Sequence, residues 1–429
     1  MPELSGHGVA RALTSLVIVI LLGMSSVPTM LDAPAIRATE PSSPEANIVT
    51  WNVGDIWEYD IELDAVILVE DSPDLSGSTL DIITGDASIL VASVTTYNVS
   101  GHWVPAYRLE IDASGQGDGR FPEPNTGIFA SGELIVTYHE TRWVRASDLA
   151  IIHRAQSIDL DFDAFGIWTT GIADFTHTHE YDPPIEVYDF PMRINETWNT
   201  VSTRTQIWSG NGGPIALNSE PEIGEEVTLY NITEIGGSPA TYSGCEESYH
   251  IWWNNTNGDL LEDHWWCPAV RNDVYWWTDD IALGGVDAKF WLTSHTPGSP
   301  SDVTVQIEPS TASLNQMLNI TITGTDDEMG TLWHHENTYD FTLVNGTATL
   351  QIPANNRMDD TPTSIDWGTH GILACLDPDG IAMICGASTL TLEGSAIGGL
   401  LRQDAIDRAP LVLDVGHQTA LRLGLSFRF

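Results

Sequence analysis

Two histidines on one predicted strand are the residues of this sequence best placed to bind a metal ion. His177 and His179 are separated by one residue, and alternate residues of a β-strand point to the same face. Imidazole nitrogens are ligands for zinc and copper. Phe175 and Tyr181 share the same predicted face, and the sequence fixes no third ligand. The pattern indicates either a metal site or two histidines packed among aromatic rings, and no cofactor is predicted beyond it.

Carboxylates beside aromatic residues could hydrolyse a glycoside, a reaction that uses two acids about 5–9 Å apart. Asp279 and Asp280 come after Trp276 and Trp277, with Thr278 between them. The chain has 60 Asp and Glu residues, so paired acids also arise by chance in solvated turns. The sequence has neither a Gly-x-Ser-x-Gly motif nor a Gly-rich phosphate loop. We therefore predict no catalytic residue, with a carbohydrate-active enzyme as an alternative.

Six of the sixteen tryptophans lie between Thr241 and Trp277, in three adjacent pairs. Neighbouring residues of a strand point to opposite faces, so each pair directs one indole to the core and one outward. Outward indoles could form a platform for sugars or apolar ligands, or they could cover the face of the sheet. The predicted ligand-binding residues are Trp252, Trp253, Trp265, Trp266, Trp276 and Trp277.

The four cysteines form two sets that are close in sequence. Cys245 and Cys267 flank a predicted hairpin whose turn, residues 254–259, is rich in Asn and Gly. Cys375 and Cys385 flank a second turn. An even number of cysteines without a tight two-residue spacing favours two disulfides over a zinc site, and disulfides indicate an oxidising compartment.

The N-terminus predicts export. Residues 1–38 have the form of a signal peptide, in which Arg11 precedes an apolar run at 13–24 and small residues follow. That run is shorter than the roughly 20 residues of a membrane helix, so we expect an extracellular or cell-surface protein with no stable membrane span in the mature chain. The glycosylation candidates are Asn98, Asn195, Asn231, Asn254, Asn319 and Asn345.

The net charge limits the partners. The formal charge is −44, from 60 acidic and 16 basic residues. Such a chain repels phosphate backbones, so nucleic acid is not an expected partner. The remaining partner classes are a glycan, an apolar small molecule or another surface protein.

Strands must position all of these residues, because residues 51–295 show almost no helical period. The clearest strand is 158–163, in which Ile158, Leu160 and Phe162 alternate with three aspartates. Landmarks such as Gly54-Asp55-Ile56-Trp57 have loose counterparts later in the chain. We therefore predict an all-β fold, with an antiparallel curved sheet, half-barrel or sandwich that is possibly duplicated. Its halves are 51–181 and 182–295, after a linker at 39–50.

A strand that opens on Gly-Asp-x-Trp, a Tyr-rich meander and a Trp-rich strand ending near Asp resemble LolA-like lipoprotein-carrier domains. That resemblance implies a half-barrel folded over an apolar cavity, although no helix is evident to plug it. Residues 302–393, after a linker at 296–301, carry short alternating strands and resemble the Ig-like modules of microbial surface proteins. The layout is similar to that of secreted surface proteins of marine archaea. Residues 394–429 form a tail of uncertain structure.

These observations favour a secreted or cell-surface, non-catalytic binding or adhesion protein. One alternative is a carrier of lipid or another apolar ligand, which requires an apolar cavity under the sheet. The other alternative, a secreted carbohydrate-active enzyme, requires two carboxylates at catalytic separation in a Trp-lined cleft.

Overall fold

The computed structural model describes residues 45–65, 77–122, 127–212, 217–278, 287–355, 368–376 and 383–393. Within these ranges the secondary structure consists of β-strands and turns, with no helix, so the predicted all-β class is confirmed. The signal peptide at 1–38, the first half of the linker at 39–50, Asp279 and Asp280, and the tail at 394–429 lie outside the described residues. In the described part of the chain, no helix has the length and apolarity needed to span a membrane.

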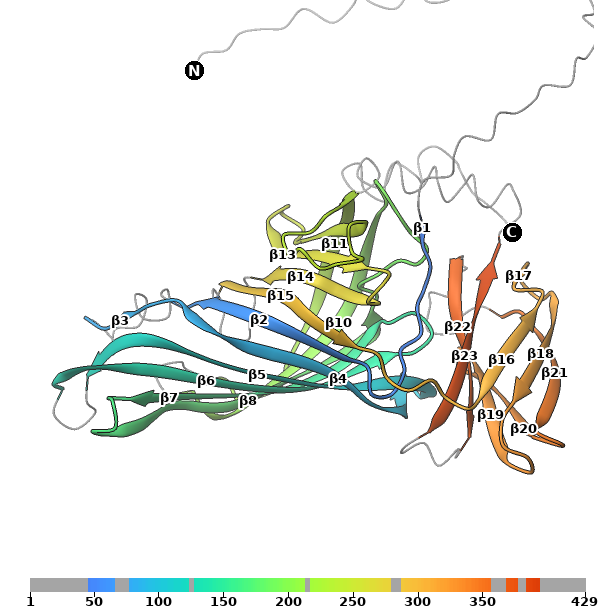
Figure 1. Ribbon diagram of the computed structural model, residues 1–429, viewed down its shortest axis with the longest axis horizontal. Helices are drawn as coiled ribbons and strands as arrows, with labels where there is room; N and C mark the ends of the chain where they lie inside the picture. Colours follow the sequence, from blue (N-terminus) through green and yellow to red (C-terminus); the bar gives the residue numbers. More distant parts are fainter. Residues whose placement is uncertain are drawn as a thin grey trace, which may run out of the picture. The chain divides into compact units, whose positions relative to one another are not determined.

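One large antiparallel sheet contains thirteen of the strands (Figure 1). They are β2 (Ile56–Asp64), β3 (Thr79–Leu80), β4 (Ile83–Val99), β5 (His102–Pro122), β6 (Phe129–Arg145), β7 (Ile151–Asp163), β8 (Thr169–Ile185), β10 (Thr197–Asn211), β11 (Glu222–Gly236), β12 (Ser248–Asn254), β13 (Leu260–Cys267), β14 (Asn272–Thr278) and β15 (Asp287–Thr296). A separate pair is formed by β1 (Glu45–Ala46) and β9 (Met192–Arg193).

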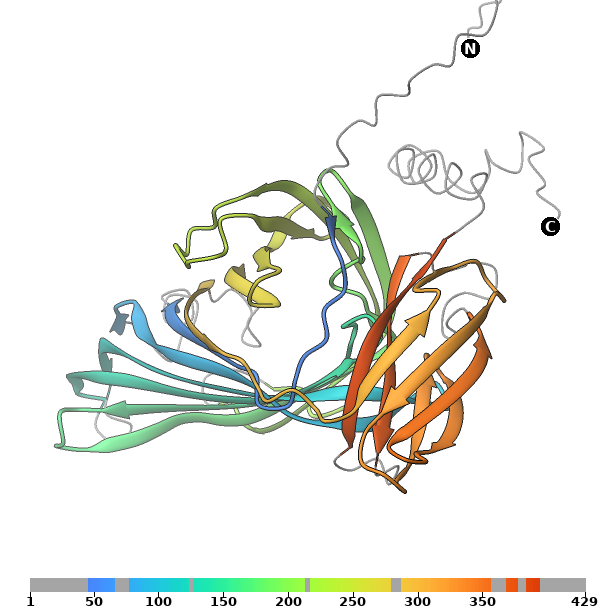
Figure 2. The ribbon, with the colours of Figure 1, turned by 45° about the vertical axis from the view of Figure 1, so that its right-hand side comes forward.

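The sheet closes into a 12-stranded barrel, which leaves only β3 outside the ring. Closure occurs because β5 pairs with β4 on one edge and with β6 on the other. The β5–β6 register runs from Ala106↔Arg145 to Pro122↔Phe129, so the curved sheet goes beyond the half-barrel that the sequence suggested. Figure 2 shows the strands from β2 to β15 curving around a common interior.

Alternation and small residues explain how these strands curl. On β7, Ile158, Leu160 and Phe162 are buried, while the intervening aspartates are partly or fully exposed. At one close approach Gly85 pairs with Gly115, and a Cβ on Gly85 would lie 1.9 Å from the carbonyl oxygen of Ser114. Only glycine permits β4 and β5 to approach in this way.

Strands from both predicted halves, 51–181 and 182–295, build this one barrel. β2 pairs with β15 across more than two hundred residues of sequence. β8 runs through the expected boundary and pairs with both β7 and β10. The internal duplication stays a prediction.

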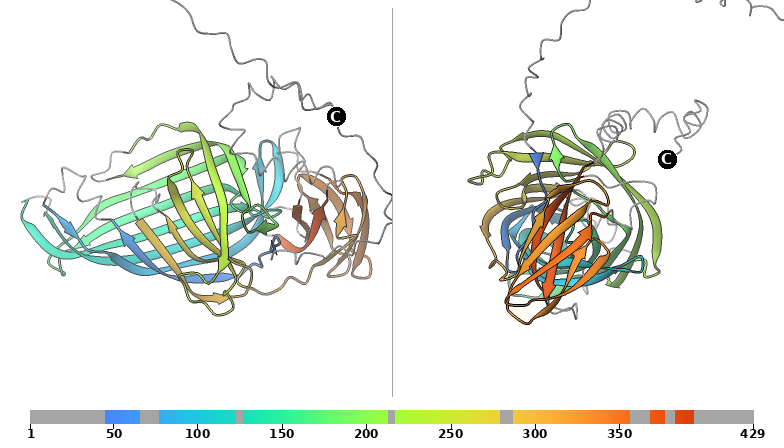
Figure 3. Two further views of the ribbon diagram at one scale, coloured as in Figure 1. Left: turned by 90° about the horizontal axis from the view of Figure 1, so that it is seen from above. Right: turned by 90° about the vertical axis from the view of Figure 1, so that its right-hand side faces the viewer.

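Two smaller sheets follow the barrel in sequence (Figure 3). One contains β16 (Thr304–Glu308), β18 (Met317–Thr323) and β21 (Thr347–Pro353), and the other contains β17 (Thr311–Ala312), β23 (Ile384–Leu392), β22 (Gly368–Leu376), β19 (Met329–His334) and β20 (Asn337–Thr342). Apolar residues of the two sheets, including Ile320 and Ile372, share one core. The likeness of this part to Ig-like modules stays a prediction.

The central strand β22 is buried along its whole length. Ile372 and Ala374 belong to the core of the two small sheets, whereas Leu373 and Cys375 pack into the core of the barrel. The backbone N–H of Gly371 also donates to the carbonyl of Ser147, 2.8 Å away in the β6–β7 turn. The C-terminal sheets are therefore packed against the barrel.

Both predicted disulfides are present. Cys245 and Cys267 are bonded with a Cα–Cα distance of 5.6 Å and tie the segment before β12 to the end of β13. Cys375 and Cys385 are directly opposite each other on β22 and β23, with a Cα–Cα distance of 4.1 Å.

Candidate functional site

The interior of the barrel contains a cavity of about 230 Å³. Most of its lining is apolar, because the inward positions of the long strands are occupied by Ile, Leu, Val and Phe. Representative apolar lining residues are Ile61, Ile83, Ile111, Phe121, Leu134 and Leu160. Along β6 the inward face changes from Leu134 and Val136 to Tyr138, Glu140 and Arg142, so an apolar region adjoins a polar one.

The first polar group surrounds Glu140, whose side chain is 1% exposed. Its carboxylate accepts hydrogen bonds from the Nε atoms of Arg142 at 2.7 Å and Arg154 at 2.9 Å. Burial alone would raise the pKa of Glu140, but the two guanidinium groups hold it well below its usual value. Tyr138 donates its hydroxyl hydrogen to Glu140 and accepts one from Gln156. Two cations therefore share one carboxylate.

The second polar group is centred on His264 of β13. Its Nδ1 lies 2.7 Å from an oxygen of Asp273, and its Nε2 lies 2.7 Å from an oxygen of Glu262. Burial would lower the pKa of His264, but Asp273 and then Glu262 raise it to about 10. The ring is thus an imidazolium at neutral pH that donates to both carboxylates. It stacks on Trp253, with centroids 4.4 Å apart and planes at 10°.

The two polar groups act on each other across the barrel. The hydroxyl of Tyr188 donates to the Asp273 carboxylate at 2.9 Å, and that of Tyr59 donates to the Asp273 carbonyl at 2.9 Å. Burial and Asp273 raise the pKa of both hydroxyls, while the charge of Arg142 lowers it. Taken together, three cations balance three carboxylates in these groups.

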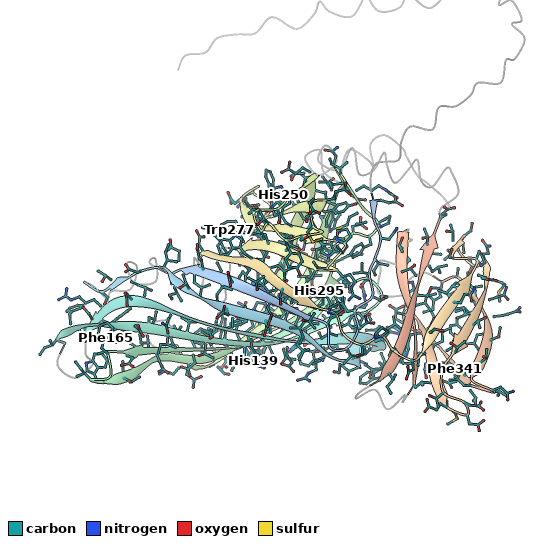
Figure 4. All side chains as sticks on the ribbon, in the orientation of Figure 1. His139, Phe165, His250, Trp277, His295 and Phe341 are labelled. Atoms are coloured by element: carbon teal, nitrogen blue, oxygen red, sulfur yellow. A yellow bond between two sulfur atoms is a disulfide. The ribbon has the colours of Figure 1, made fainter. Side chains whose placement is uncertain are left out.

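The six predicted tryptophans take different positions. Trp253 and Trp276 line the cavity, and Trp266 is fully buried in the barrel core. Trp252 is 39% exposed and donates to His250, and Trp265 stacks on the same imidazole with centroids 4.2 Å apart. Trp277, on β14, is partly buried and is labelled with His250 in Figure 4. Trp252 and Trp253 divide between an exposed and a cavity-facing position, whereas Trp265 and Trp266 are both buried, so the outward indole expected of that pair is not found. Ligand binding by these tryptophans stays a prediction.

His177 and His179 lie on the buried face of β8, with their Nε2 atoms 2.6 Å apart. Burial lowers the pKa of His177 to about 4 and, together with the charge of Arg154, that of His179 to about 2. His177 stacks on Trp208, with centroids 3.4 Å apart. Among the described residues, no group of three or more His, Cys, Asp and Glu side chains could hold a metal ion. Metal binding by this pair stays a prediction.

The six sequon asparagines all lie at least partly exposed, and four of them are fully exposed. Asn98, Asn195, Asn319 and Asn345 are the exposed four, and Asn231 and Asn254 are intermediate. Their positions leave room for glycans.

Sequence reasoning did not single out Glu140, Arg142 or Arg154 as site residues. The sequence did contain a signal for this group, namely a local cluster of arginines. The chain has only 16 basic residues in 429, and three of them are Arg142, Arg145 and Arg154. His264 and Asp273 were also missed, although both lie inside the tryptophan-rich segment. Their chemistry depends on strand register, which brings His264 opposite Trp276.

Comparisons with known proteins add little to this description. No protein-family model matches the chain, and no curated protein matches it. A solved structure titled as a polysaccharide lyase aligns with 81% of this chain and 40% of its own length, at 7% identity and a TM-score of 0.20. The chain therefore spans less than half of that protein, and a TM-score this low supports no argument about fold or activity.

Proposed function

We propose that the barrel binds a small molecule with a large apolar part inside its cavity, and that the protein is an exported, non-catalytic binding protein. The observation that carries this proposal is the largely apolar cavity of about 230 Å³. An apolar cavity of about 150 Å³ already admits benzene, and small-molecule sites begin at about 300 Å³. The cavity is thus of the right order for a compact ligand, which agrees with the carrier function expected from LolA-like domains.

The polar groups beside the cavity support binding rather than catalysis. A general base or acid acts best with a pKa near the working pH and a free path to the substrate. His264 is held as an imidazolium between two carboxylates, and Glu140 is held as a carboxylate between two arginines. Their hydrogen bonds fix both groups in one protonation state, as expected for groups that order a binding site.

Export is supported by chemistry that suits an oxidising, extracellular environment. Two disulfides persist mainly in such compartments, and both cysteine pairs are bonded. The exposed sequons and the signal-like N-terminus point the same way. In this proposal the C-terminal sheets, packed on the barrel, belong to the binding unit as well as linking it to the cell surface.

Calorimetric titration with benzene tests the proposal. Binding inside the barrel should show a negative heat-capacity change, which marks the burial of apolar surface. Ile111→Trp should abolish the binding because it fills the cavity, whereas Ile207→Trp should not, because Ile207 is 40% exposed. Absence of binding to the wild type, or equal binding by both variants, would rule out the cavity as the site.

Sugar binding on the outer wall is a second candidate, favoured by the exposed indole of Trp252. Its Nε1 lies 2.9 Å from Nε2 of His250, and the same imidazole nitrogen lies 2.6 Å from a carboxylate oxygen of Asp263, so the indole lies beside this His–Asp pair. An exposed indole beside a carboxylate suits stacking of a sugar ring. Trp252→Ala should then remove oligosaccharide binding and leave benzene binding unchanged.

A further inference from the structure

Three buried histidines meet in the C-terminal sheets. His334 ends β19, His335 follows it in the chain, and His370 lies on β22; the three residues are 0%, 3% and 3% exposed. The ring centroids of His334 and His335 are 4.7 Å apart, and those of His335 and His370 are 4.9 Å apart. We call these three residues the histidine cluster. Its rings are not arranged as metal ligands, since no group of three or more His, Cys, Asp and Glu side chains in the described ranges could hold a metal ion.

The histidine cluster lies where the C-terminal sheets contact the barrel. Gly371, which follows the third histidine on β22, donates its N–H to the carbonyl of Ser147 in the β6–β7 turn at 2.8 Å. Trp333, which precedes the first histidine on β19, packs in the barrel core. The charge of Arg145, at the end of β6, acts on the ring of His335. A change in the charge of the histidine cluster therefore acts on this contact.

The hydrogen bonding of His334 requires a neutral ring. The backbone N–H of Asn355 donates to its Nε2 at 2.8 Å, and a ring nitrogen that accepts a hydrogen bond carries no proton. A protonated ring has an N–H group at both nitrogens, so proton uptake would turn this hydrogen bond into two N–H groups that face each other. In agreement with this geometry, burial lowers the pKa of His334 to about 4.

The surroundings of His335 also disfavour a charged ring. Neither of its ring nitrogens has a hydrogen-bond partner within the part of the chain that the structure describes, whereas an imidazolium has two N–H groups that need acceptors. Burial, followed by the charges of His334, His370 and Arg145, holds the pKa of His335 well below its usual value. Both of these histidines are therefore neutral in the folded protein at neutral pH.

The other charged groups of the neighbouring elements cannot balance two added protons. Asp148 accepts a hydrogen bond from Nε of Arg145 at 2.9 Å, so these two charges offset each other. Glu336, which is partly buried, follows the cluster in the chain and can offset one proton. On β20, Asp340 is exposed to solvent, and the hydroxyl of Tyr339 accepts a hydrogen bond from a side-chain amide at 3.0 Å. Two protons on the cluster would thus leave a net positive charge in a buried place, which is unfavourable.

We propose that the histidine cluster makes the contact between the C-terminal sheets and the barrel sensitive to acid, so that proton uptake by His334 and His335 loosens this contact while the barrel stays folded. Groups that take up protons only in the opened state favour that state as the pH falls. The contact should therefore be complete above about pH 6.5, the pKa of a histidine in water, and should weaken below it. This inference does not depend on a ligand in the cavity.

Hydrogen–deuterium exchange of the full chain at pH 7 and pH 5, corrected for the intrinsic exchange rates, tests this inference. A peptide that covers β22 should lose about tenfold of its protection at pH 5, whereas one that covers β13 should change by less than about threefold. The β13 peptide reports unfolding of the whole barrel, and it contains His264, whose raised pKa keeps it charged at both pH values.

His335→Asn removes one titrating ring at a position where the backbone φ is 54°, which Asn tolerates. It should reduce the effect of acid on β22 to about threefold. His139→Gln, on a side chain that is 48% exposed, is the matched control and should keep the effect of the wild type.

Three results would overturn the inference. The first is equal protection of β22 at the two pH values. The second is an equal loss in β13, because acid would then act on the whole fold. The third is a His335→Asn variant with the full effect of acid, because the response would then come from other groups. If His335→Asn does not fold, His334→Gln provides the same test, since its side-chain oxygen can still accept from the N–H of Asn355 and does not titrate.

Discussion

His264 should make the stability of the protein fall as the pH rises above neutrality. The folded pKa of His264 is about 10, whereas an unfolded histidine has a pKa of about 6.5. Because the folded pKa is raised, the stabilisation is complete below about pH 6.5 and is lost as the pH rises through 10. A shift of about 3.5 pKa units corresponds to about 5 kcal/mol, and the slope in this window is about 1.4 kcal/mol per pH unit.

Urea denaturation at pH 6, 7, 8 and 9, followed by tryptophan fluorescence, measures this slope. Measured against His264→Gln, the wild type should lose about 3 kcal/mol of unfolding free energy between pH 6.5 and 9, because histidines with lowered pKa values, such as His177 and His334, act equally in both proteins. His264→Gln should be less stable at pH 6, because it leaves two buried carboxylates without a cation, and its stability should vary little over the same window. His139→Gln is the matched control, since the His139 side chain is 48% exposed, and it should retain the wild-type slope.

The reasoning would be refuted if the difference in unfolding free energy between the wild type and His264→Gln changed by less than about 1 kcal/mol over this range. It would equally be refuted by a His264→Gln variant with the wild-type slope, because the pH dependence would then come from other groups. The imidazolium is the centre of the second polar group. Either result would therefore remove the charge balance between the two polar groups of the barrel interior.

Three further predictions concern stability. Glu140→Gln should cost about 3 kcal/mol in urea denaturation, because it leaves two partly buried arginines without a carboxylate partner, whereas Glu234→Gln, on a side chain 60% exposed, should change little. For His334, burial lowers the folded pKa to about 4, so its stabilisation is present above about pH 6.5 and is lost as the pH falls. Acidification from pH 7 to 5 should cost about 2 kcal/mol through this residue, and His334→Phe should reduce the total loss by that amount. The double variant Cys245→Ala/Cys267→Ala should lower the free energy of unfolding by about 2–4 kcal/mol without affecting the slope at alkaline pH; a loss below about 0.5 kcal/mol would contradict a structural role for that bond.

Local patterns predicted the strands and the cysteine bonds well. The alternation at 158–163 became β7, with Ile158 and Leu160 facing the cavity, because the side-chain period of a strand is a local property. Cys245 and Cys267 were predictable because the turn between them is encoded in neighbouring residues. The same period accounts for Trp252 and Trp253, of which one is exposed and the other lines the cavity, but not for Trp265 and Trp266, which are both buried.

The closure of the barrel and the polar groups could not be predicted in this way. Pairing of β2 with β15 joins segments more than two hundred residues apart, and no local pattern specifies which distant edges meet. The contact of Glu140 with Arg154 depends on the register of β6 with β7, which places Arg142 opposite Arg154. A shift of one residue would turn these charges to the other face.

The number of strands explains why a cavity exists at all. The diameter of a barrel grows with its strand number, and about eight strands give an interior that side chains just fill. Twelve strands enclose more space, so something else must occupy it. Trp51, Tyr188 and Phe190, from segments outside the barrel strands, pack into the core; Trp51 and Tyr188 also line the cavity, so these segments bound the remaining space without filling it. If the barrel had only a structural role, apolar side chains that filled this space would make the folded state more stable. The cavity instead remains beside a group of balanced charges, which is the arrangement expected where a ligand completes the interior.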